Sequence, residues 1–278
     1  VRLVLKRSAA HWKLLTPVVA GVLLAVSLMT SGVIYSDALE ELGLRYALNQ
    51  MDQEELHFEF YSNYNRGGRE YYEKANSFVN GSLTRNIGWF SKGLTRHLKS
   101  ATFYISFGDQ PVYTGPNRPR GFVQSLSGLY DEVDLVSGNL PAEVSAEINN
   151  RGFSTSIPEI EAAISYESSV DFDIDVGDQM TLMPYWNDVN SEVTVVISGI
   201  IRPKDPSGEY WLGDTNRFSY LNTEYINVPL FVPEHTLLDG LSPSFPGMTI
   251  DYGWIFYIEP SAITRTNAEM AVRGLNGL

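Results

Sequence analysis

The sequence predicts an α+β protein: one N-terminal transmembrane helix, then a mixed α/β extracytoplasmic domain with a β-rich subdomain. Three observations support this prediction. Residues 14–34 are apolar and uncharged, residues 69–99 have the apolar periodicity of a helix, and four short β-branched or aromatic segments follow residue 175. The chain of 278 residues, 44% of them hydrophobic and 19% charged, is long and apolar enough to bury a core.

The apolar run Leu14–Ile34 is long enough to cross a membrane as one helix. Its residues, numbered 14 to 34, would span about 32 Å at ~1.5 Å per residue, close to the ~30 Å hydrocarbon core of a bilayer. A cleaved signal peptide and a buried soluble helix are the alternatives. The anchor is favoured because no clean small-residue cleavage site follows the run, and because an apolar stripe continues at helical spacing to Ala47.

Charge is distributed unevenly around this run. The residues before it hold no acid and four bases, namely Arg2, Lys6, Arg7 and Lys13. The whole chain has 20 bases and 33 acids, so residues 14–278 hold 16 bases and 33 acids, a charge of −17. The positive-inside rule then places the N-terminus in the cytoplasm and the residues after 35 outside. An acidic body of this kind also disfavours general nucleic-acid binding.

These observations divide the chain into four parts. We expect a basic cytoplasmic N-terminus at 1–13, a transmembrane helix at 14–35, an extracytoplasmic domain at 36–260 and a final helix at 261–278. The N-terminal residues also mix bases with apolar side chains, which suits either a short interfacial helix or an irregular membrane flank.

The first part of the outer domain predicts a strand, a helix and a second strand. Apolar residues alternate with polar ones from Leu56 to Phe60, and Gly67–Gly68 end this strand. Helical periodicity covers 69–99 and is broken near Gly81, whereas Thr102–Phe107 reads as a strand. Strand, helix and strand together make a compact α+β unit.

The second part is richer in β structure. Ile160–Tyr166 is short and apolar, and Asp175–Asp178 is a turn. The strands Gln179–Met183 and Val193–Ile201 flank a polar loop, so they predict a hairpin. Two more strands are predicted at Val228–Val232 and Trp254–Ile258.

The sequence shows no residue pattern typical of catalysis or of metal binding. It has no cysteine, its four histidines are scattered, and it lacks a phosphate-binding glycine loop. One acidic cluster lacks the glycine and glutamate positions of a calcium loop and is interpreted as a surface loop; it comprises Asp171, Asp173, Asp175 and Asp178. We therefore expect no catalytic residue, no bound cofactor and no metal.

Gly177 and Asp178 are the residues to which we assign a structural role. Gly177 permits a tight turn with positive φ before the strand Gln179–Met183. Asp178 carries a carboxylate that can accept backbone N–H groups and fix the turn.

The order of these motifs resembles the MacB-like periplasmic core domain of FtsX/MacB-type ABC transporter permeases. In that family, an N-terminal anchor precedes a short apolar segment ending near a serine, a VGD turn that opens a strand, and a β-rich stretch ending in V-x-G-I. The matching places here are Ile160–Ser165, Val176–Asp178 and Val195–Ile200, with Ile197 where valine is usual.

The resemblance implies a permease subunit in the cell membrane rather than an enzyme. Its partners would be a cytoplasmic ABC ATPase subunit that hydrolyses ATP, a second permease copy or paralogue, and membrane lipid. The outer domain would couple ATPase motion to export or release of a substrate that the sequence does not identify. Further membrane helices would follow, so that residues 261–278 lead towards the next one. The alternative is a single-pass anchored sensor or binding domain without a transport role.

Overall fold

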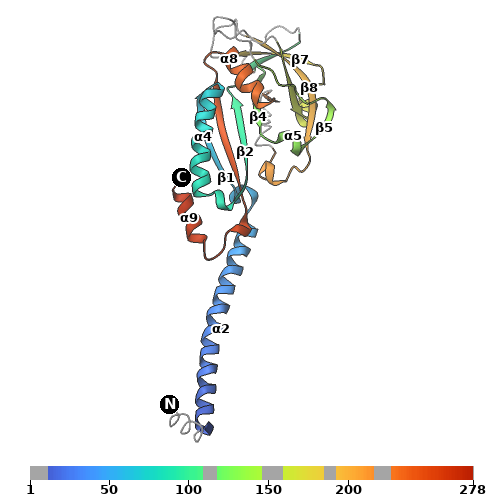
Figure 1. The fold of residues 1–278 in the computed structure, drawn as a ribbon. Helices are drawn as coiled ribbons and strands as arrows, with labels where there is room; N and C mark the ends of the chain where they lie inside the picture. The colour runs from blue at the N-terminus through green and yellow to red at the C-terminus, as the bar shows by residue number, and fades with distance from the viewer. Residues whose placement is uncertain (1–11, 109–117, 146–158, 185–191, 216–226, 278) are drawn as a thin grey trace. The chain divides into compact units, whose positions relative to one another are not determined.

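The computed structural model describes residues 12–108, 118–145, 159–184, 192–215 and 227–277 (Figure 1). The chain forms two compact units. The helical unit comprises the N-terminal part up to Met51 together with Pro260–Asn276, and the β unit comprises Asp52–Glu259 with Gly277.

In the helical unit, α2 is one uninterrupted helix, Trp12–Gln50. It contains the predicted apolar run and its helical continuation, so the boundary expected at residue 36 is not a break in secondary structure. Pro17 lies early in the helix, where a missing N–H costs little. Within the described residues, α2 is the helix long and apolar enough to cross a membrane, with a mean hydropathy of 2.1 in its most apolar window.

The C-terminal segment of the helical unit is less helical than the sequence predicted. After the short 3₁₀ turn η4, Pro260–Ala262, helix α9 covers Ala268–Asn276 only. The expected helix over 261–278 is therefore wrong for residues 263–267. The side chain of Asn267 accepts the N–H of Thr264 at 2.7 Å and donates to the carbonyl of Ala262 at 3.0 Å, which holds a turn in place of a helix.

The β unit begins with a three-stranded antiparallel ribbon in the order β1–β10–β2. Its strands are β1 Phe58–Arg66, β10 Thr249–Ile258 and β2 Ser91–Ser100. The other edge of β2 pairs with β4, Arg120–Leu126, so the ribbon continues into the remaining strands.

Beyond β4 the strands close into a six-stranded ring. The order is β4–β3–β7–β8–β6–β9, and β9 returns to pair with β4 in parallel. The remaining ring strands are β3 Phe103–Phe107, β6 Glu159–Ser165, β7 Gln179–Pro184, β8 Val193–Pro203 and β9 Asn227–Phe231. Strand β5, Val133–Gly138, pairs with the outer part of β8. Closure satisfies the backbone groups that an open sheet leaves at its edges.

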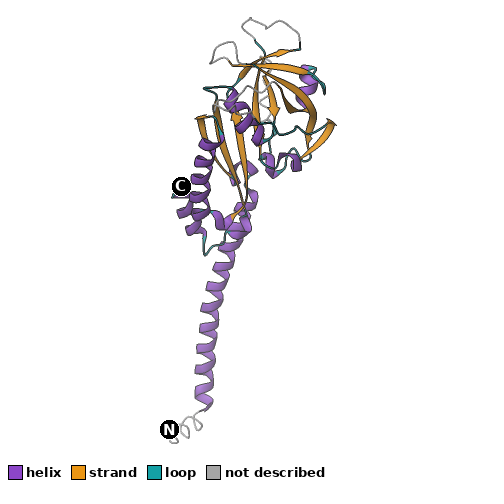
Figure 2. Cartoon of the chain, turned by 45° about the horizontal axis from the view of Figure 1, so that its top comes forward, coloured by secondary structure: helices purple, strands orange, loops and turns teal. Residues whose placement is uncertain are grey.

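Helix α4, Arg69–Asn86, covers one face of the ribbon, as both ribbon views show (Figures 1 and 2). It buries Tyr72 and Leu83 against that face, and the ring of Tyr72 meets the ring of Tyr252 edge to face at 5.3 Å. The predicted break near Gly81 does not occur, because nothing interrupts the helix there and a Cβ at Gly81 would meet no atom within 4 Å.

The helix predicted over 69–99 ends instead at Asn86, and residues 91–99 belong to strand β2. Leu94 and Leu98, assigned to a helix face from the sequence, pair with Phe256 and Tyr252 of β10. Strand β2 is hydrogen-bonded on both edges, and this long-range pairing outweighs a weak local preference.

Most of the other predicted strands are confirmed. The hairpin β7–β8 pairs Gln179 with Val196, β1 begins at Phe58 rather than at Leu56, and β10 begins earlier than expected, at Thr249. The polar loop predicted inside the hairpin lies outside the described residues. The short remaining helices are α3 Gln53–Leu56, α5 Leu129–Glu132, α6 Tyr166–Phe172, η2 Glu209–Trp211, η3 Thr236–Leu241 and α8 Ser242–Ser244.

Candidate functional site

The Val176–Asp178 turn is bonded to strand β8. Gly177 has φ +96°, its N–H donates to the carbonyl of Ile197 at 2.8 Å, and Ile197 N–H donates to the carbonyl of Asp178 at 2.9 Å. The Asp178 carboxylate accepts the N–H of Asp175 at 2.8 Å. Asp178 is exposed rather than half-buried, so the loss of this one bond should cost less than the sequence argument assumed.

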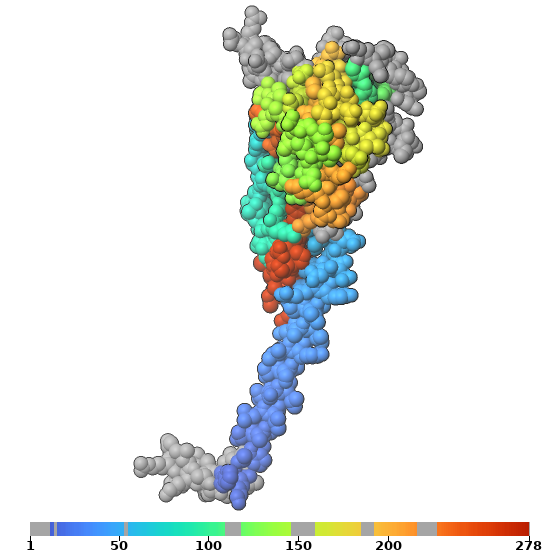
Figure 3. All heavy atoms as spheres, turned by 90° about the vertical axis from the view of Figure 1, so that its right-hand side faces the viewer, coloured from blue at the N-terminus to red at the C-terminus, as the bar shows by residue number. Residues whose placement is uncertain are grey.

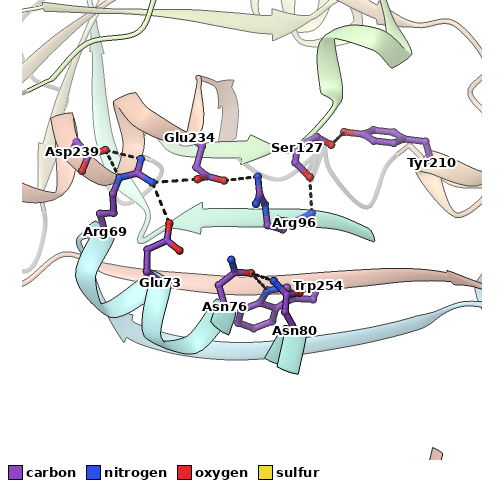
Figure 4. A network of polar contacts seen from close by, with 10 residues as sticks. All are labelled: Arg69, Glu73, Asn76, Asn80, Arg96, Ser127, Tyr210, Glu234, Asp239 and Trp254. Carbon is purple, nitrogen blue, oxygen red and sulfur yellow. Dashed lines mark hydrogen bonds and ion pairs between the residues drawn. The ribbon is translucent and has the colours of Figure 1, made fainter. Parts of the chain in front are cut away.

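A second group of polar residues lies at the start of α4 and around η3. The guanidinium of Arg69 contacts one carboxylate oxygen of Asp239 through two nitrogens, at 2.6 and 2.7 Å (Figure 4). Arg69 also lies 3.4 Å from Glu73 and 3.5 Å from Glu234. These carboxylates, with Asp239 first, raise the pKa of Arg69. The cation is thus matched by three acids from two elements.

Glu234 extends this group to the ribbon. Its second oxygen lies 3.2 Å from the guanidinium of Arg96 on β2. The backbone N–H of Arg96 donates to the hydroxyl of Ser127 at 2.8 Å, and the carbonyl of Ser127 accepts the hydroxyl of Tyr210 at 3.3 Å (Figure 4). The network therefore connects α4, the segment after β9, β2 and the loop before α5.

This network forms one wall of a cleft of about 670 Å³ in the β unit. The charged lining residues are Arg69, Arg96, Asp131, Glu143 and Glu234. Their charges sum to −1, so the cleft has no excess of positive charge for an anion. Burial, with a smaller effect from Glu143, raises the pKa of the lining residue Tyr130 to about 12, which keeps its hydroxyl protonated at neutral pH.

Next to the cleft, Ser145, His235 and Asp239 have the hydrogen-bond order of a hydrolase triad. The hydroxyl of Ser145 bonds to Nε2 of His235, and Nδ1 of His235 lies 2.8 Å from Asp239. However, the Asp239 oxygen that His235 contacts is also the oxygen clamped by Arg69. The guanidinium offsets the negative charge that would stabilise an imidazolium, which argues against base catalysis.

The same contacts have a structural explanation. Thr236 accepts the N–H of Val144 at 3.0 Å and donates to the carbonyl of Ala142 at 3.4 Å, one residue from His235. Together, Thr236 and His235 fix the segment 142–145 on η3. We interpret the Ser145–His235 bond as part of this attachment.

The helical unit contains a third group, which we call the Arg265 clasp. The guanidinium of Arg265 lies 3.1 Å from Asp37 and 3.3 Å from Glu40, and its backbone N–H donates to Glu41 at 2.8 Å. Glu41 also pairs with Arg45 at 2.9 Å. The charged groups are substantially exposed, so each pair contributes roughly 0–1 kcal/mol. The clasp therefore positions the segment after β10 on α2 more than it adds stability.

Sequence reasoning identified the turn but neither the cleft network nor the clasp. Glu234 and Arg96, for example, are 138 positions apart (234 minus 96) and meet only through the fold. Asp37, Glu40 and Glu41 could have been recognised as an acidic helix face, but their partner Arg265 could not. Among the described residues, no three His, Asp or Glu side chains are grouped so as to hold a metal ion.

Comparisons with known proteins give limited information. No protein-family profile and no curated protein matches the sequence. One similar solved structure is a domain of a "putative permease protein" from Porphyromonas gingivalis. It is 13% identical, with 82% of this chain and 86% of that chain covered and a TM-score of 0.35.

Proposed function

We propose that the chain is the permease subunit of an ABC transporter complex in the cell membrane. In this proposal the residues before α2 are cytoplasmic, the apolar part of α2 crosses the membrane, and the β unit is extracytoplasmic. It couples motion of a cytoplasmic ABC ATPase to export or release of a substrate. The basic N-terminus, the acidic remainder and the family resemblance of the sequence support this orientation and role.

The observation that carries the proposal is the Arg265 clasp. Asp37 and Glu41 are three and seven residues beyond Ile34, which places them about 5–10 Å past the end of the apolar run along the helix. The chain leaves α2, forms the β unit, and returns after β10 to this point on α2. A domain whose entry and exit meet beside the membrane surface is placed like an insertion between two membrane helices.

Helix α2 is suited to transmit a movement. Its 39 residues extend about 58 Å, roughly twice the ~30 Å hydrocarbon core. Because one helix joins the span to the clasp, displacement of the cytoplasmic end would reach the segment that follows β10. In a single-pass sensor, nothing requires the C-terminal segment to return to this place.

The test is purification of the full chain from membranes of cells that express it natively. In mild detergent, a stoichiometric ABC ATPase subunit should remain bound, and the sample should hydrolyse ATP in a vanadate-sensitive manner. A membrane-embedded chain that purifies without an ATPase would favour the anchored sensor.

A matched pair of variants tests the role of the clasp. Arg265→Ala should reduce the effect of the full chain on ATP hydrolysis by the bound ATPase without reducing the amount of complex. Arg273→Ala on α9 removes a similar charge whose guanidinium contacts the carbonyl of Glu269 at 3.3 Å, and it should have little effect. Equal effects of both changes would argue against coupling through the clasp.

A further inference from the structure

We propose that the extramembrane part of α2 pairs with the same part of α2 from a second copy of the chain, as a parallel two-helix coiled coil. This inference rests on α2 crossing the membrane, which belongs to the proposed function. It assigns a specific surface to the permease partner, which we call the α2 seam: Tyr35, Leu39, Leu42 and Tyr46.

The α2 seam is an exposed apolar stripe on a helix whose opposite side is covered. Its four side chains are 67%, 50%, 65% and 68% exposed. At 100° per residue, they lie opposite Asp37, Glu41, Leu44 and Leu48, which are half-buried. Figure 3 shows the C-terminal segment (red) against one side of the upper part of α2 (blue). The apolar seam is therefore left over after the contacts of the helical unit are made.

The spacing of the seam is that of a coiled coil. Its residues follow one another at intervals of 4, 3 and 4, the heptad alternation that keeps one face towards a partner helix. The same alternation continues into the apolar run through Gly32, Leu28, Ala25 and Gly21. The seam is thus the outer half of a stripe that runs along most of α2.

Lipid cannot cover the outer half of this stripe. Leu42 and Tyr46 are 8 and 12 residues beyond Ile34, or about 12 and 18 Å along the helix. The headgroup layer on one side of a bilayer is only about 5–8 Å thick. Tyr35 can be an interfacial residue, but Leu42 and Tyr46 project past the headgroups and need a protein partner.

Charge and orientation favour a second copy as that partner. The residues flanking the seam include Ser36, Ala38 and Gly43, which are small and uncharged, whereas the acids that bond Arg265 lie on the far side. Membrane insertion gives every copy the same direction, so two α2 helices pair in parallel and in register. Each layer then meets its own counterpart, Gly32 with Gly32 and Leu39 with Leu39, which an isologous interface requires.

The absence of cysteine from the sequence makes a direct crosslinking test possible. Single changes Leu39→Cys and Leu42→Cys are made in the full chain and oxidised in native membranes. Both should give a disulfide-linked homodimer. Ala47→Cys is the control, because this exposed residue lies about 110° around the helix from the seam, and it should give little dimer.

A charge on the seam provides a second measurement. Leu42→Asp combined with Leu39→Cys would place two carboxylates against each other, so dimer formation should fall at least tenfold, whereas Ala47→Asp with Leu39→Cys should not change it. Equal crosslinking at Leu39→Cys and Ala47→Cys, or products of another mass, would overturn pairing of two α2 helices. A chain that resists alkaline extraction but does not crosslink overturns this inference alone. A chain that leaves the membrane on extraction overturns the anchored permease.

Discussion

His97 on β2 lies with its Nε2 atom 3.1 Å from the amide oxygen of Gln124 on β4, where the ribbon joins the ring. Both side chains are buried, with 2% and 0% of their surface exposed. The amide oxygen accepts a hydrogen bond, so Nε2 of the neutral imidazole carries the proton. The contact therefore joins the two parts of the β unit through an uncharged histidine.

This histidine predicts a loss of stability in mild acid. Burial lowers the pKa of His97 to about 4, from an unfolded value near 6.5. Between these values the unfolded chain binds more protons, so the free energy of unfolding falls as pH drops from about 6.5 to about 4, by up to about 3 kcal/mol. Burial also lowers the pKa of His57, which adds in the same direction.

Urea titration of the full chain in detergent at pH 7 and pH 4.5 measures the effect. His97→Gln removes the titrating group while retaining an amide for Gln124, so the variant should lose less stability than the wild type between the two pH values. If both proteins lose the same amount, His97 is not the cause.

The turn variants Gly177→Val and Asp178→Ala should lower the melting temperature by different amounts. At φ +96°, valine strains the backbone by about 1–3 kcal/mol, and no neighbour lies within 4 Å of a Cβ, so the cost is conformational. Asp178→Ala loses one exposed bond, worth about 0.5–1 kcal/mol. Thermal unfolding checks the order. Normal melting of both variants with loss of function would show that the turn acts in the working cycle.

Asn76→Ala should destabilise the ribbon by about 1–3 kcal/mol. The indole N–H of the buried Trp254 donates to the Asn76 amide oxygen at 3.0 Å, and alanine would leave this N–H without its acceptor (Figure 4). Asn80→Ala is the matched control, because it removes only a donor to the same oxygen at 3.2 Å. Denaturant midpoints of the two variants should differ clearly, with Asn76→Ala the lower.

The Ser145–His235–Asp239 arrangement should not act as a hydrolase. Because Arg69 contacts the same Asp239 oxygen at 2.6 Å, we expect no labelling of Ser145 by a fluorophosphonate probe. Labelling at Ser145 that disappears in Ser145→Ala would overturn this interpretation. Arg69→Met tests the reason directly, since any reactivity of Ser145 should rise when the clamp on Asp239 is removed.

Local patterns in the sequence were sufficient for several elements. The uncharged run and its helical continuation predict α2, because a long apolar helix needs no tertiary partner to be recognised. The hairpin β7–β8 and the positive φ of Gly177 likewise follow from alternation and turn chemistry between near neighbours.

Other features depended on contacts between residues far apart in the chain. Residues 91–99 have an apolar spacing compatible with a helix, and they become strand β2 because β10 and β4 pair with both of its edges. Closure of the ring likewise depends on β9 returning to β4.

The sequence by itself thus determined the long apolar helix, the main β segments and the strained turn, while only the tertiary structure decided the cleft network and the Arg265 clasp. Helical and strand periodicities are local, so a short window of sequence carries them. An ion pair such as Arg265 with Asp37 joins residues 228 positions apart (265 minus 37). Its partner is chosen by how the intervening chain folds, because any exposed arginine could have paired with that acid.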